Sequence, residues 1–81
     1  MESKVEAVKK NLKNGEVVMW RDPRLNSGGT LGGAAFLSYE CGEYIYSDRC
    51  GNSFTPEYAI SEEDAEECIR YAMGVGRWQY L

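Results

Sequence analysis

Two stretches of the chain place apolar residues at the 3.6-residue spacing of an amphipathic helix. In the first, the apolar positions fall at i, i+3 and i+7: Val5, Val8 and Leu12. Ser3–Glu6 matches the S-x-x-E capping box, in which a hydroxyl and a carboxylate each satisfy a free backbone N–H. Asn14–Gly15 follows, and glycine readily adopts the left-handed conformation that ends a helix. The pattern therefore predicts a helix over residues 4–14.

The second helical pattern lies in the C-terminal third of the sequence. Ser61 is a favoured N-cap residue, and the acidic residues 62–64 follow it at the positive end of the helix dipole. The apolar positions then repeat at i, i+3, i+4, i+7 and i+8: Ala65, Cys68, Ile69, Ala72 and Met73. Gly74 or Gly76 ends the helix. This stripe is predicted to face the core.

The remaining apolar segments are short and bounded by glycine, proline or turn residues, as strands are. They cover residues 16–21, 34–41, 43–47, 52–55 and 77–81. A glycine-rich loop is predicted over 22–33, and a turn over 48–51. Short connections favour antiparallel pairing. We therefore expect one domain, 1–81, of the α+β class and order α-β-β-β-(β)-α-β. Its two amphipathic helices cover one face of a small antiparallel sheet of three to five strands. The other face is left to solvent or to a partner.

The composition indicates the number of domains and the cellular location to expect. The chain has 81 residues and a net charge of −4, which suits one small folded domain. Its first residues are charged, and no apolar run is long enough for a signal peptide or a membrane span. An odd number of cysteines, three, favours reduced thiols and a cytoplasmic location. All the lysines lie in the first helix and are predicted to form a solvated face: Lys4, Lys9, Lys10 and Lys13.

Residues for catalysis or metal binding are scarce. The chain has no histidine, and its cysteines (Cys41, Cys50 and Cys68) lack the paired spacing of a zinc site. Cys50, in the predicted turn, is the one candidate for a reactive thiol, but no histidine is available as its base. The sequence therefore predicts a protein that is not an enzyme and that has no metal site and no cofactor.

Two features favour a binding surface instead. The second helix carries more acids than capping requires: Glu62, Glu63, Glu66 and Glu67. In the predicted strand, Tyr44, Tyr46 and Asp48 share one face of the sheet. If Ile45 faces the helices, these tyrosines face outward, where tyrosine is favoured at protein interfaces. The alternative is that they pack in the interior, against Trp78 and Tyr80 or under the loop. The acidic balance of the chain argues against stacking of nucleic-acid bases on them.

The glycine-rich loop offers a second kind of site. Glycines permit close backbone approach to a ligand, and arginines suit bidentate phosphate recognition. The candidates for binding a nucleotide or signalling molecule are Arg21, Arg24, Gly28, Gly29 and Gly32. A Walker-type loop, however, ends in Lys-Ser/Thr and leads into a helix, whereas this loop leads into a strand pattern. A mobile hairpin loop is the plainer interpretation.

The leading functional hypothesis is a small acidic protein-interaction module. It would act as an inhibitor or adaptor on the basic surface of a larger partner, such as one that itself binds nucleic acid, without direct nucleic-acid or membrane contact. In general character the chain resembles small inhibitors encoded by phages and mobile elements, including anti-CRISPR proteins. That likeness assigns no role to any residue.

Overall fold

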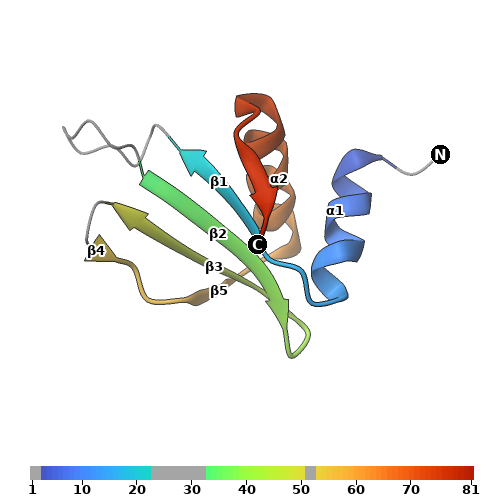
Figure 1. The fold of residues 1–81 in the computed structure, drawn as a ribbon. Helices are drawn as coiled ribbons and strands as arrows, with labels where there is room; N and C mark the ends of the chain where they lie inside the picture. The colour runs from blue at the N-terminus through green and yellow to red at the C-terminus, as the bar shows by residue number, and fades with distance from the viewer. Residues whose placement is uncertain (1–2, 23–32, 51–52) are drawn as a thin grey trace.

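The computed structural model describes residues 3–22, 33–50 and 53–81, and these form two helices and one antiparallel sheet (Figure 1). The helices are α1 (Lys4–Lys13) and α2 (Glu62–Val75). The strands are β1 (Val18–Asp22), β2 (Gly33–Glu40), β3 (Glu43–Cys50), β4 (Ser53–Phe54), β5 (Tyr58–Ile60) and β6 (Trp78–Tyr80). Their order in the sheet is β4-β3-β2-β1-β6, and β5 also pairs with β3. The predicted α+β class is confirmed.

Both helices begin and end at the residues that the sequence indicates. The hydroxyl of Ser3 accepts a hydrogen bond from the backbone N–H of Glu6, and α1 ends before Gly15, whose φ is +99°. Likewise, Ser61 accepts from the backbone N–H of Asp64, and α2 ends at Gly76 in the left-handed conformation. Within the described residues, neither helix is long and apolar enough to cross a membrane.

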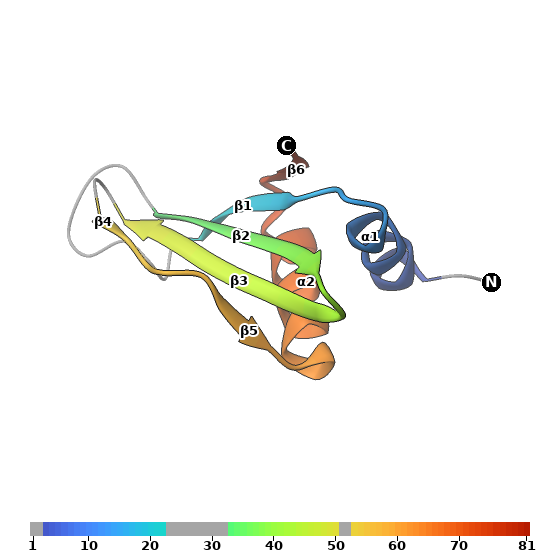
Figure 2. The ribbon, with the colours of Figure 1, turned by 90° about the horizontal axis from the view of Figure 1, so that it is seen from below.

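The helices pack on one face of the sheet, and the core lies between the helices and that face. In Figure 2, α2 crosses the strands on one face of the sheet, and α1 lies beside it, near the β2–β3 hairpin. The core is formed by residues from both helices and three strands: Val8, Leu12, Val18, Trp20, Ala35, Leu37, Tyr44, Ala65, Ile69 and Ala72. Trp20 lies at its centre, fully buried, and its Nε1 donates to Asp22 Oδ2 at 3.4 Å. Alternate residues of each strand therefore face the helices.

Apart from shifts of one or two residues at strand ends, the strands differ from the predictions in two places. Residues 48–50 belong to β3 rather than to a turn, because Arg49 and Asp48 pair with Ala34 and Ala35 of β2. Strand β5 was not predicted, and with it the described sheet has six strands where three to five were expected. The C-terminal strand β6 is confirmed, and it pairs with β1 of the same chain.

Lys9 departs from the predicted solvated lysine face. Its side chain is only 7% exposed and lies between α1 and α2. Its Nζ is 2.6 Å from Glu66 Oε2, 2.7 Å from Glu62 Oε2 and 3.2 Å from Glu6 Oε1. The aliphatic stem can therefore pack in the helix interface while the ammonium stays paired. These carboxylates raise the pKa of Lys9, so the lysine is held in its charged form.

Candidate functional site

The tyrosines of β3 face the helices, so of the two placements that the sequence left open the structure has the inward one. The strand register sets Tyr46 opposite Leu37, a core residue, and leaves Ile45 on the uncovered face. Tyr44 is consequently 5% exposed and packs edge-on against Tyr39, with ring centroids 4.9 Å apart. Tyr46 is half-buried. Of the two rings, only Tyr46 lines the cleft described below.

The acids of α2 fall into two sets. Glu62 and Glu66 point toward α1 and are paired with Lys9, and Glu66 also lies 3.5 Å from Arg70. Lys9 lowers the pKa of Glu62, chiefly through its hydrogen bond. These two carboxylates thus help to join the helices. Glu63, Asp64 and Glu67 are exposed, and within the described residues none of the three has an ion pair; we call them the free acids. They are the acidic charges of α2 that remain available to a partner.

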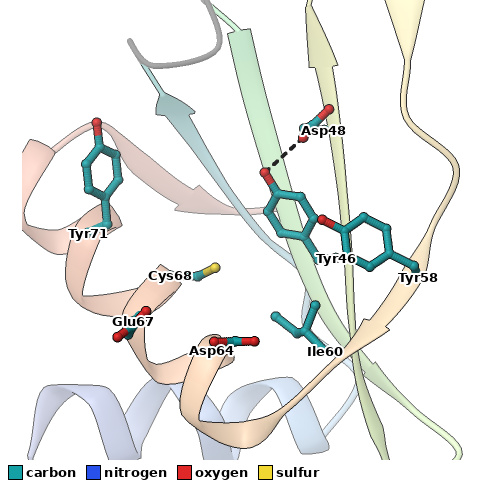
Figure 3. A pocket seen from close by; sticks show the side chains of 8 residues that line it. All are labelled: Tyr46, Asp48, Tyr58, Ile60, Asp64, Glu67, Cys68 and Tyr71. Atoms are coloured by element: carbon teal, nitrogen blue, oxygen red, sulfur yellow. Dashed lines mark hydrogen bonds between the residues drawn. The ribbon is translucent and has the colours of Figure 1, made fainter.

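A cleft of about 340 Å³ separates α2 from β3 and β5 (Figure 3). It is lined by Tyr46 and Asp48 of β3, Tyr58 and Ile60 of β5, and Asp64, Glu67, Cys68 and Tyr71 of α2. Three phenol rings and three carboxylates thus meet where the acidic helix borders the tyrosine-bearing strand. The two surfaces that the sequence suggested separately, on the helix and on the strand, adjoin at this cleft.

Hydrogen bonds fix the sheet side of the cleft. The Tyr46 hydroxyl donates to Asp48 Oδ2 at 2.9 Å, and the Thr55 hydroxyl donates to Asp48 Oδ1. Burial and the bond to Asp48 raise the pKa of Tyr46, so the phenol stays protonated and remains a donor. The Tyr58 ring lies 5.4 Å from the Tyr46 ring, tilted by 60°. Asp48 is therefore held in place, and each of its oxygens keeps acceptor capacity for a further donor.

Of the alternative ligand site, only Arg21 falls within the described residues. Arg24, Gly28, Gly29 and Gly32 lie outside them. Arg21 is exposed on the uncovered face of the sheet, and its backbone N–H donates to the carbonyl of Arg77 at 2.9 Å. Together with Met19, Gly76, Trp78 and Gln79, the two arginines line a hollow of about 310 Å³.

The three cysteines lie at separate places in the described part of the chain. No group of three or more His, Cys, Asp or Glu side chains there is arranged to hold a metal ion. Cys41 is an exposed free thiol in the β2–β3 turn, with φ of +52°. Cys68 is half-buried on the wall of the cleft and is not in a disulfide. Cys50 is the last residue of β3.

Of the residues that line the cleft, the sequence had named Tyr46, Asp48 and Glu67 as candidates, and the others were missed. Some of the missed residues had a visible signal. Asp64, Glu67, Cys68 and Tyr71 fall at i, i+3, i+4 and i+7, so they share one side of α2. That spacing is readable from the sequence. Tyr58 had no such signal, because β5 is three residues long and follows Pro56 closely. Arg77 joins Arg21 only through the pairing of β6 with β1.

Comparison with protein families, curated proteins and solved structures finds no match to this chain.

Proposed function

We propose that this protein is a small interaction module that acts as an inhibitor or adaptor, docking on the basic surface of a larger protein. The docking surface consists of the free acids on α2 and the adjoining cleft. The inhibitor role follows the general character of the chain, which is that of small phage or mobile-element inhibitors such as anti-CRISPR proteins. The proposed setting is the cytoplasm, in keeping with Cys41 and Cys68, which are not in disulfides.

The observation that carries this proposal is the unneutralised charge on α2. Glu63 and Glu67 are like charges at i, i+4, a pair that costs helix stability. Within the described residues no cation lies within ion-pair distance of either, although Lys9 and Arg70 pair with Glu66 on the same helix. A partner with basic residues would relieve this repulsion, and complementary charge would accelerate its association. Half-buried tyrosines beside the acids supply contact area typical of interfaces.

Reversing the charge of the free acids should weaken docking. We expect Glu63→Lys/Glu67→Lys to slow association with the partner by about tenfold and to flatten its salt dependence, because electrostatic steering acts mainly on the association rate. The partner is first captured from a lysate of the source cells on the immobilised chain. Association rates are then measured at salt concentrations from about 50 to about 500 mM, because exposed charges become screened over this range. An inhibitor would also lower the captured protein's own activity.

The control carries the same change of charge elsewhere. Glu40 and Glu43 are exposed on the β2–β3 hairpin, away from the cleft, so Glu40→Lys/Glu43→Lys should leave capture and association nearly unchanged. Equal losses in the two variants would show that only net charge matters. Capture that survives the α2 reversal unchanged would rule out this docking surface.

A second function, binding of a small anionic ligand, is favoured by the pairing of Arg21 with Arg77 in one hollow. If it holds, a nucleotide or pyrophosphate at about 100 times its dissociation constant should stabilise the fold by about 2.7 kcal/mol. Thermal unfolding with a nucleotide panel measures this. Arg21→Gln should abolish the shift, and Arg70→Gln, an exposed arginine on α2, should preserve it. A flat response across the panel would remove this function.

A further inference from the structure

We propose that the cleft is a socket for a single arginine side chain of the partner. This inference rests on the proposed docking function and names the group that the docking surface recognises. The guanidinium would lie between the rings of Tyr46 and Tyr58 on the sheet side and the carboxylates of Asp64 and Glu67 on α2 (Figure 3).

The aromatic wall favours a flat cation. Tyr46 and Tyr58 present two rings tilted by 60° with centroids 5.4 Å apart, and Tyr71 stands on the opposite, helical wall. Tyrosine faces attract cations, and guanidinium can also stack on them because it is planar and weakly hydrated. Tyr58 is 50% exposed, so a large aromatic surface is available to an incoming side chain. A compact, strongly hydrated ammonium would gain less from these rings.

The spread of the carboxylates favours a forked donor over a point charge. Asp48 lies on the sheet wall, and Asp64 and Glu67 lie on the helix wall, so the acids approach the cleft from two sides. They form no grouping fit for a metal ion within the described residues. A guanidinium carries five N–H donors in a fixed fork, so it can donate to more than one carboxylate at a time. Asp48 is already oriented by Tyr46 and Thr55, which reduces the cost of binding.

The size and charge of the cleft set limits on its occupant. A volume of about 340 Å³ is at the small end of ligand sites and matches one long side chain better than a nucleotide. Three carboxylates repel phosphate and carboxylate groups. A free amino acid would bring its own carboxylate into this field, whereas an arginine within a peptide brings only the cation. The occupant is therefore an arginine within a protein chain.

Titration of the isotope-labelled full chain with small probes tests the socket directly, without the partner. The probes are N-acetyl-arginine methylamide, its lysine counterpart and its neutral isostere, the citrulline derivative. We expect saturable NMR shifts at the amides of Tyr46, Tyr58, Cys68 and Tyr71 with the arginine probe. The citrulline probe should bind about tenfold more weakly than the arginine probe, since loss of one charged hydrogen-bonding partner changes affinity on this scale. The lysine probe should also bind more weakly, because its ammonium is compact and cannot stack on the rings.

Substitutions at the cleft test whether the arginine probe binds there. Glu67→Gln and Asp64→Asn should each weaken the arginine probe about threefold to tenfold. Glu40→Gln, which removes the same charge on the β2–β3 hairpin, should not. Tyr58→Phe should retain binding, and Tyr58→Leu should lose most of it, because only the former keeps the ring.

Two results would overturn the socket: equal binding of arginine and citrulline probes, or shifts that centre on Glu63 instead of the cleft. If partner capture responds to the α2 charge reversal while these probes fail, docking stands and the socket is wrong. If the probes bind in the cleft and no partner depends on α2, the socket stands and the docking function fails.

Discussion

Replacing Trp20 with alanine should lower the free energy of unfolding by about 3–5 kcal/mol, the range typical of a fully buried tryptophan. Trp20 has no exposed surface and belongs to the same core cluster as residues of both helices, and its ring centroid lies 6.3 Å from that of Tyr46. A chain of this size has a total stability of about 4–12 kcal/mol, so the variant would lose a large part of it. Chemical denaturation followed by circular dichroism measures the change.

Two further variants keep this prediction testable if the alanine variant does not fold. Trp20→Phe retains a ring and loses the Nε1 bond to Asp22, so its loss should be about 1–2 kcal/mol. Phe36→Ala removes an aromatic ring from the uncovered face of β2, opposite Met19, and should cost less than Trp20→Ala. A larger loss for Phe36 than for Trp20 would show that the wrong face of the sheet had been assigned to the core.

Local signals were enough to predict most of the fold. Ser3, Ser61 and Gly76 mark helix ends through hydrogen bonds and backbone conformations that depend on a few neighbouring residues. What the sequence left open was which face of β3 meets the helices. Both sets of alternating residues in that strand contain apolar side chains, with Ile45 on one face and tyrosines on the other, so a period of two does not decide between them. The register with β2 decides, and it depends on residues distant in the sequence.

The same limit explains the partial success at the site. The acidic helix was visible in the sequence, but its division into paired and free acids was not. Glu62 and Glu66 are separated from Lys9 by more than fifty residues, and only the packing of α1 against α2 brings them together. The spacing of acids along a helix shows which of them share a side. It does not show which side meets a buried cation.

Replacing Lys9 with methionine should lower the free energy of unfolding by about 1–3 kcal/mol. The buried ammonium contacts three carboxylates, and removing one partner of a buried ion pair costs more than breaking a surface pair. The cost is moderated because Glu6 and Glu62 are more than half exposed and regain water. Methionine keeps most of the packing of the stem. Lys4→Met, an exposed lysine of the same helix, should change stability by less than about 0.5 kcal/mol.

The pH dependence of the Lys9 variant should differ from that of the wild type on the acid side. Because the pKa of Glu62 is lowered in the folded state, its contribution to stability is present above its ordinary value of 4.5 and is lost as pH falls below it. The raised pKa of Lys9 acts oppositely, with stability lost above 10.5. Tyr44 and Tyr46, whose pKa values are also raised, destabilise the fold over that same alkaline range, so the acid side gives the cleaner test.

The gap in unfolding free energy between wild type and Lys9→Met should therefore shrink as pH falls from 7 through the region of about 4.5. In a Glu66→Gln background the same lysine substitution should cost about 1 kcal/mol less, because the shortest of its ion pairs is already gone. An unchanged cost in both backgrounds, together with a gap independent of pH, would mean that Lys9 stabilises only through its stem. Under the ion-pair account, Lys9 also anchors the helix that carries the free acids. The Lys9→Met substitution should then loosen α2 and weaken partner capture, even though Lys9 lies outside the cleft.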